Sequence, residues 1–367
     1  MSKKLTYDKT MFICATLILV VGLVMIYSAS AMIATQKIGT DNPYYFLTRQ
    51  CIWLLVAGAL MFALMHLDLD VLRDPRVIYL MLGGICAALV LVLFQAPING
   101  THRWFVLPYF QFQPAELAKP IVVLFLASFL AYREERIDEL SSALLPLGAV
   151  LAIVGGLILL QPDFGTAATI LFVAAAMVFV AGVSWKRIAI GGMLFVPIAA
   201  TVLLSADYRR DRLTSFLNPE SDPLGKGFQA MQSLIALGTG GATGLGIGNG
   251  RQKLFFLPEP HTDFIFSIIG EELGFIGAFG LLAIFGVLVA RGLRLANVSA
   301  ERDRFVFYAA LGLTLMIAVQ VLVNVSVALC LLPTKGIPLP LVSYGGSSLL
   351  ASLIGVGLLL NFSQQTS

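Results

Sequence analysis

The chain has 367 residues, of which 58% are hydrophobic and only 12% are charged, and this balance excludes an ordinary soluble domain. The composition predicts an integral membrane protein. The formal net charge of +3 is too small to indicate nucleic-acid binding, and the basic residues lie in scattered pairs rather than in one stripe.

Apolar stretches long enough to cross a membrane recur along the chain. Crossing about 30 Å of hydrocarbon takes roughly 20 mostly apolar residues. The first stretch has no small-residue cleavage site after it, so we expect it to be retained as an anchor. We therefore predict an all-α membrane fold of about ten transmembrane helices. The predicted spans are 11–33, 46–66, 77–94, 115–132, 143–160, 166–183, 187–205, 263–290, 305–331 and 342–361.

Basic residues divide unevenly between the connections of these helices. With the N-terminus inside, alternate connections and the N-terminal segment hold thirteen of the 24 lysines and arginines. The positive-inside rule then predicts that both termini are cytoplasmic. Segment 206–262 becomes a large extracytoplasmic loop between the seventh and eighth helices. We interpret residues 1–367 as a single polytopic membrane domain that includes this loop.

Unusual polarity gathers in the connections that this topology places outside. These connections are 95–119, the turn "QPDFG" at 161–165, the loop 206–262 and "PTKGIPLPLVSYGGSS" at 333–348. We therefore expect the functional chemistry at the outer face.

Two familiar kinds of site find no support in the sequence. The four cysteines show no C-x-x-C spacing and the three histidines lie far apart, so neither a disulfide framework nor a zinc site is indicated. The run "LGTGGATGLGIGNGRQK" contains neither G-K-[ST] nor a G-x-G-x-x-G register, so it does not predict a phosphate loop. We expect its glycines to permit close packing and positive φ angles.

Ionisable residues also mark the outer boundary of the predicted helices. In "FQPAELAKP", Pro114 suits the first turn of a helix, which places Glu116 and Lys119 on one face. A helix-end ion pair explains them structurally, but charges in an apolar span are costly and are candidate functional residues. Arg103, in "NGTHRWF", and Arg49, at the start of the second span, are predicted at the same boundary.

Asp263 directly precedes an apolar helix in "LPEPHTDFIFSIIGEELG". Two interpretations stay open from the residues alone: an N-terminal cap that stabilises the helix, or a functional carboxylate. Glu271 and Glu272 lie further along the helix on other faces, so the two-carboxylate arrangement of glycoside hydrolases does not apply.

Five motifs occur along nearly the whole chain in the order "FQPAELAKP", "QPDFGTA", "FLNPESDPLGKGFQAMQSLIALGTGG", "FLPEPHTDFIFSIIGEELG" and "LLPTKGIPLPLVSYGGSS". In these motifs the chain resembles the SEDS family (shape, elongation, division and sporulation). Within the family, "PTKG" followed by "PLVSYGGSS" is more similar to members that serve division than to those that serve elongation.

The resemblance implies a peptidoglycan glycosyltransferase that polymerises lipid II at the outer face of the bacterial cytoplasmic (inner) membrane, for cell division or elongation. It places the catalytic carboxylate of the family's H-T-D motif on Asp263. Joining two disaccharide units needs one base near the attacking hydroxyl and positive charge near the departing pyrophosphate. We therefore assign Asp263 as general base for the acceptor's GlcNAc 4-hydroxyl, with inversion at the donor's MurNAc carbon.

Further residues are candidates for binding the substrate or tuning Asp263. Many relatives carry a basic residue where this chain has Gln111, which removes the support for one phosphate contact that the family implies. A divalent cation bridging Asp263 and the pyrophosphate stays open, but the sequence shows no dedicated ligand cluster, so we assign no metal ligand and no cofactor. The substrate-binding candidates are Arg49, Arg103, Glu116, Lys119, Lys335, His261 and Thr262.

The resemblance also implies partners. These are lipid II (the undecaprenyl-pyrophosphate-linked disaccharide peptide), a cognate class B penicillin-binding protein with transpeptidase activity, other division or elongation proteins, and membrane lipid. Two alternatives remain, a flippase for the lipid-linked precursor and a non-catalytic scaffold of the division machinery. Charges concentrated at the outer face favour the enzyme over a carrier. A scaffold would need Asp263 only as a helix cap.

Overall fold

The computed structural model describes residues 7–36, 42–98, 100–106, 110–134, 137, 139, 143–204, 227–333 and 336–366. Within these ranges every predicted span coincides with a helix, which confirms the all-α class. Seven of the described helices are long and apolar enough to cross a membrane. Two further apolar helices have 16 and 17 residues. The total of ten membrane crossings stays a prediction.

The ten helices that match the predicted spans are α1, α2, α4 to α8 and α11 to α13. The short helices α3 and α10 and one pair of two-residue antiparallel strands were not predicted. The helices are α1 Lys9–Gln36, α2 Tyr45–Met65, α3 Leu69–Arg73, α4 Pro75–Leu91, the 3₁₀ turn η1 Val92–Phe94, α5 Pro114–Tyr132, α6 Leu145–Leu160, α7 Phe164–Val180, α8 Trp185–Leu204, α10 Phe228–Gly240, α11 Ile265–Ser299, α12 Arg304–Ala328 and α13 Gly346–Thr366, and the strands are β1 Phe105–Val106 and β2 Gln111–Phe112.

Several helices begin at an acidic cap. The side chain of Asp74 accepts a hydrogen bond from the second residue of α4, which also has proline at its first position. Asp163 and Asp303 cap α7 and α12 in the same way. Such residues satisfy backbone N–H groups that a helix start leaves open, so these starts follow local sequence signals.

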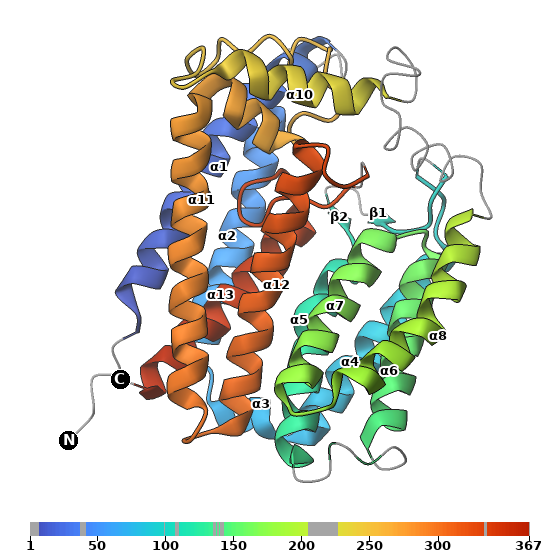
Figure 1. Ribbon diagram of the computed structural model, residues 1–367. Coiled ribbons are helices and arrows are strands. Elements are labelled where there is room, and N and C mark those ends of the chain that lie inside the picture. The colour runs from blue at the N-terminus through green and yellow to red at the C-terminus, as the bar shows by residue number, and fades with distance from the viewer. Residues whose placement is uncertain are drawn as a thin grey trace.

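The helices pack around the most buried members, α5, α12 and α13. Helix α13 packs against α2, and α12 packs between α11 and α5 (Figure 1). Helices nearer the periphery expose large apolar side chains such as Leu55, Leu80 and Phe172. An exposed apolar surface of this kind is expected where a protein faces lipid.

The polar connections lie at one end of the bundle, which we call the loop end. It holds the β1–β2 hairpin, the turn at 161–163, helix α10 with the segment that follows it, and the segment 336–345 (Figure 1). At the opposite end the backbone N–H of Asp8 donates to Ser363 Oγ at 2.9 Å. The start of α1 and the end of α13 therefore meet at one end of the bundle, as the predicted topology requires.

Helix α11 is broken at Gly274, where φ is +68°. Segment 241–246, just after α10, lies against the break and exchanges backbone hydrogen bonds with both sides of it. A buried helix break must have its backbone polar groups paired, and this segment pairs them. The bonds are Leu245 N to Glu271 O, Gly246 N to Glu272 O, Phe275 N to Gly241 O and Ile276 N to Ala242 O, at 2.9–3.0 Å.

The glycines of this segment have the role expected of them. Gly241, Gly244, Gly246 and Gly248 all have positive φ angles. A Cβ atom added at Gly244 would lie 2.2 Å from the carbonyl oxygen of Glu272. Only glycine allows both the conformation and the close approach, so the prediction of close packing and positive φ is confirmed.

Two adjacent acids of α11, Glu271 and Glu272, are almost fully buried, and their carboxylates hold residues 248–253. Glu272 pairs with Lys253 at 2.7 Å and accepts a hydrogen bond from Ser28 of α1 at 2.7–2.8 Å. Glu271 accepts hydrogen bonds from the backbone N–H groups of 251–252 at 2.7 and 3.2 Å. These carboxylates therefore tie the loop end to α1 and α11.

The predicted topology is testable with two exposed positions at opposite ends of the bundle. In a variant without the four native cysteines, Asn249→Cys should react with an impermeant thiol reagent applied from outside, because it lies at the loop end. Glu301→Cys, between α11 and α12, should react only after the membrane is permeabilised. The reverse pattern of labelling would overturn the predicted orientation.

Candidate active site

Asp263 lies at the loop end in the turn before α11, and its side chain is half-buried. The N-cap of α11 is Phe264, and among the described residues no side-chain hydrogen bond caps the helix. The N-cap position of α11 is thus occupied by Phe264 and not by Asp263. A Cβ atom added at Gly336 would lie 2.9 Å from Asp263 Oδ2, so the carboxylate lies directly against segment 336–345.

The backbone around Asp263 is held by residues that are distant in sequence. All three carbonyl oxygens of 261–263 accept hydrogen bonds, from the backbone N–H of Tyr344, the hydroxyl of Ser343 and the side-chain amide of Asn324. The donor–acceptor distances are 2.9, 2.6 and 3.0 Å. Segment 336–345 and α12 thus fix the H-T-D turn.

The two other residues of the H-T-D motif have different surroundings. The His261 ring is buried between Phe46 of α2 and Tyr344, with ring centroids 4.5 and 5.5 Å apart. Thr262 is half-buried, and its hydroxyl donates to the carbonyl of Glu259 at 3.2 Å. The structure places both residues beside Asp263, and their contact with substrate stays a prediction.

Arg49 lies next to this aromatic cluster. Its guanidinium stacks over the ring of Tyr45, 4.6 Å from the centroid, in a cation–π contact. Burial raises the pKa of the Tyr344 hydroxyl, and the positive charge of Arg49 opposes that rise. Arg49 therefore lies against segment 336–345, the segment that also bonds the H-T-D turn. Lys335, the residue before Gly336, lies outside the described residues.

Arg103 lies at the loop end, the predicted boundary, where it contacts the turn at 161–163. Its guanidinium donates to the carbonyl oxygens of Gln161, at 2.7 Å, and Pro162. These carbonyls lie at the C-terminal end of α6, where a basic side chain is favourable. The following residue, Asp163, accepts a hydrogen bond from Gln113 Nε2 at 2.9 Å. Arg103 thus shapes the 161–163 turn, and a contact with phosphate stays a prediction.

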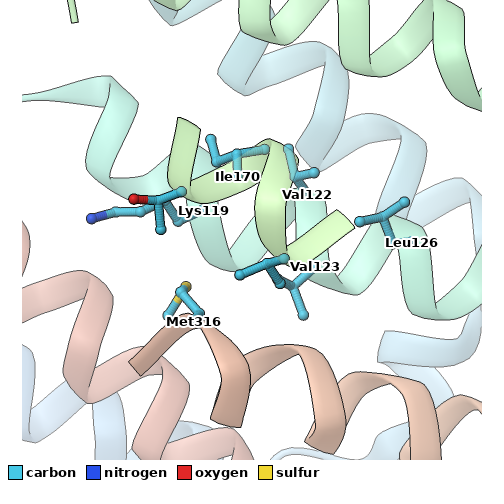
Figure 2. A pocket seen from close by; sticks show the side chains of 8 residues that line it. Lys119, Val122, Val123, Leu126, Ile170 and Met316 are labelled. Carbon is cyan, nitrogen blue, oxygen red and sulfur yellow. The ribbon is translucent and has the colours of Figure 1, made fainter. Parts of the chain in front are cut away.

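Glu116 and Lys119 form an ion pair at 2.8 Å in the first turns of α5, and both side chains are almost fully buried. The predicted pairing on one helix face is confirmed. The stem of Lys119 borders a small cavity, and Figure 2 shows its amine pointing away from Val122 and Val123. The cavity is lined by Lys119, Val122, Val123, Leu126, Thr169, Ile170, Val173 and Met316 of α5, α7 and α12.

The motifs on α5, α7 and segment 336–348 lie side by side at the loop end. The backbone N–H of Gln113 donates to Ser347 Oγ at 2.9 Å. A Cβ atom added at Gly165 would lie 2.8 Å from the side chain of Ile337. Neither Gln113 nor Ser347 was among the predicted site residues, although both lie inside motifs that carry the family resemblance.

Asn324 was missed for a different reason. It lies in α12, within the predicted span 305–331, and no motif marks it. The signal in the sequence was a single amide side chain within an apolar span. Polar side chains in such spans are costly and tend to be functional. Within the described ranges, no group of three or more His, Cys, Asp or Glu side chains is placed to hold a metal ion.

Comparison with known proteins identifies relatives along the whole chain. A family model described as "cell cycle protein", whose name joins FtsW, RodA and SpoVE, matches residues 8–367. A probable peptidoglycan glycosyltransferase FtsW of Trichlorobacter lovleyi is 42% identical over 358 residues, which are 97% of this chain and 93% of that protein. Stage V sporulation protein E of Bacillus subtilis is 39% identical over 364 residues, 99% of this chain and 98% of that protein.

Solved structures agree with this assignment. The rod shape determining protein RodA of Thermus thermophilus matches with a TM-score of 0.71 and 33% identity, over 99% of this chain and 98% of that one. A chain from a structure of a peptidoglycan synthase complex that coordinates polymerization and crosslinking matches with a TM-score of 0.78 and 35% identity, over 98% of both chains. This protein therefore belongs to the SEDS family of multi-pass membrane proteins, together with FtsW, RodA and SpoVE.

Proposed function

We propose that this chain is a peptidoglycan glycosyltransferase that polymerises lipid II into glycan strands at the outer face of the bacterial cytoplasmic membrane. Relatives at about 40% identity carry the name peptidoglycan glycosyltransferase FtsW, which supports this activity and a role in cell division. The observation that carries the proposal is that the motifs of α5, α7 and segment 336–348, together with Asn324 of α12, meet at the loop end around one half-buried carboxylate, Asp263.

The reaction joins two substrate molecules at this carboxylate. The 4-hydroxyl oxygen of the acceptor's GlcNAc forms a bond to C1 of the donor's MurNAc, and the bond from C1 to the pyrophosphate oxygen breaks. Asp263 takes the hydroxyl proton, and undecaprenyl pyrophosphate leaves with the electron pair. Attack opposite the leaving group inverts the configuration at C1. A single general base suffices for this step.

The leaving pyrophosphate needs nearby positive charge. Arg49 is best supported for this role, because it lies beside Tyr344 and hence beside the segment that bonds the H-T-D turn. Lys335 directly precedes Gly336, whose backbone lies against Asp263. Lys119 is held by Glu116 deeper in α5. For Arg103, whose donors engage carbonyls, we propose a supporting role in shaping the 161–163 turn.

A polymerisation assay with purified lipid II distinguishes the enzyme from a flippase and from a scaffold. The purified protein, alone or with its cognate class B penicillin-binding protein, should convert lipid II into glycan strands. A flippase would leave lipid II unpolymerised in both reactions and move it between leaflets of proteoliposomes, and that result would reject the enzyme. A scaffold would show neither activity.

Asp263→Asn tests the general base. Asn keeps the size and polarity of Asp but cannot accept the hydroxyl proton. Polymerisation per folded molecule should therefore fall by about 10²–10⁴-fold, the usual contribution of general acid–base catalysis. Melting temperature and lipid II affinity should stay near wild type. A variant that polymerises at nearly the wild-type rate would refute the assignment of Asp263.

Glu272→Gln is the contrasting control for a structural carboxylate. Glu272 is fully buried and bonds Lys253, Ser28 and the backbone N–H of Gly248. Removing its charge leaves Lys253 without its counterion, at a cost of about 3–5 kcal/mol for a buried pair. Yield and melting temperature should fall, whereas turnover per folded molecule should change much less than in Asp263→Asn.

Glu116 and Lys119 should depend on each other. Each single Ala substitution leaves one buried charge without its partner, which lowers the free energy of unfolding by about 3–5 kcal/mol. Each should therefore impair polymerisation. The double variant should be less impaired than the sum of the two singles. Asp70→Ala is the control, because it removes an exposed ion pair with Arg73. It should lower the free energy of unfolding by about 1 kcal/mol or less. Strict additivity of the first two changes would contradict an interaction.

Gly336→Ala tests the close approach to the carboxylate. The new methyl group would lie 2.9 Å from Asp263 Oδ2 and should push the carboxylate aside. We expect turnover to fall by about 10–100-fold, since small misplacements of reacting groups carry costs of this size. Gly345→Ala is the matched control, because its methyl group would meet only Ser348 Cβ at 3.8 Å. Equal turnover of the two variants would contradict the argument.

A further inference from the structure

Three consecutive carbonyl oxygens of the H-T-D segment, 261–263, each accept a hydrogen bond from outside that segment. Such a turn before a helix normally leaves its carbonyls to solvent or to the helix itself. Here two of the three donors are side chains, which a substitution removes without altering the backbone. The pairs are Tyr344 N to His261 O at 2.9 Å, Ser343 Oγ to Thr262 O at 2.6 Å and Asn324 Nδ2 to Asp263 O at 3.0 Å.

Asn324 is almost fully buried in α12 and uses its amide for two bonds. Its Nδ2 donates to Asp263 O and, at 2.8 Å, to Ile337 O. Because both partners are carbonyls, the orientation of the amide is fixed. Its Oδ1 is buried without a hydrogen-bond partner among the described residues. The amide therefore bonds two backbone carbonyls and leaves one buried acceptor unsatisfied, which costs stability.

Ser343 is held in place from both sides. Its hydroxyl donates to Thr262 O and accepts a hydrogen bond from the backbone N–H of Leu339 at 2.8 Å. From α2, Gln50 Nε2 donates to the carbonyl of Ser343 at 3.4 Å, and Gln50 Oε1 accepts from the backbone N–H of Gly345 at 3.2 Å. The serine hydroxyl is therefore a fixed donor rather than a rotating one.

These bonds determine where the Asp263 side chain points. Peptide units are planar, so fixing the carbonyls of Thr262 and Asp263 fixes the planes on both sides of the Asp263 Cα. The direction of the Cα–Cβ bond follows from those planes. We propose that Asn324 and Ser343 are positioning residues that hold the H-T-D backbone so that the Asp263 carboxylate is aimed at the acceptor hydroxyl. This inference rests on the proposed function.

Ser233 provides a matched control for the loss of a buried hydroxyl. It is fully buried in α10, donates to Ala328 O at 2.7 Å and shares a hydrogen bond with Ser267 Oγ at 2.6 Å. It joins α10, α11 and α12, and its hydrogen bonds within the described part of the chain do not include residues 261–263. Ser233→Ala therefore removes the same chemical group with a similar structural effect.

The experiment compares Ser343→Ala, Ser343→Thr, Asn324→Asp and Ser233→Ala in the full-length protein. For each variant, kcat and KM for lipid II polymerisation are measured together with the melting temperature. Ser343→Ala and Asn324→Asp should lower kcat by about 10–100-fold, the scale expected when a reacting group is misplaced by about 1 Å. KM should change by less than about threefold, because a uniform loss of binding raises KM instead. Ser343→Thr should recover most of the rate.

Ser233→Ala should lower the melting temperature as much as Ser343→Ala and leave kcat within about twofold of wild type. The inference is overturned if the kcat of Ser343→Ala matches that of Ser233→Ala, or if only KM rises. Should Asn324→Asp fail to fold, the two serine variants decide the question. Asp263→Asn at nearly the wild-type rate would instead reject the proposed function, whereas an inactive Asp263→Asn beside an active Ser343→Ala rejects positioning alone.

Discussion

The break of α11 at Gly274 is the constraint on which the loop end depends. A helix interrupted inside a buried bundle leaves N–H and C=O groups that cannot stay unpaired. Segment 241–246 supplies the missing partners through its backbone, and glycines make the approach possible. A Cβ atom at Gly240 would lie only 1.9 Å from the carbonyl oxygen of Gly270, so α10 and α11 are in direct backbone contact. The loop end is thereby joined to α11 through backbone contacts as well as through the carboxylates of Glu271 and Glu272.

This junction leads directly to the candidate active site. From segment 241–246 the chain passes over Glu271 and Glu272, which hold residues 248–253, and then reaches the H-T-D turn. There Asn324 and segment 336–345 hold the backbone of the turn through hydrogen bonds to its carbonyl oxygens. The carboxylate of Asp263 thus lies where two sets of buried hydrogen bonds meet. These buried hydrogen bonds restrict the motion of the turn, and a positioned base requires such restriction.

The sequence predicted the elements that depend on local composition and missed those that depend on distant contacts. Apolar length alone located the spans, because only regular helices pair every backbone group in lipid. Helix α10 was missed inside a polar loop, since it is stabilised by packing on α11. Arg103 was predicted at the outer boundary as a candidate for substrate binding, but its bonds to carbonyls 58 and 59 residues away were not predicted, because no local pattern reveals them. Asn324 was hidden in an apolar span for the same reason.

The burial of Glu272 has a consequence for how the protein enters the membrane. A lone carboxylate in an apolar span opposes insertion. Its counterion, Lys253, lies 19 residues earlier in the chain, whereas its other side-chain partner, Ser28, lies 244 residues away. The segment from α10 to α11 therefore carries its own neutralising charge as it is synthesised. The Glu272 carboxylate can thus meet its counterion within this segment and bond Ser28 of α1 afterwards, so its neutralisation does not depend on the docking of α1.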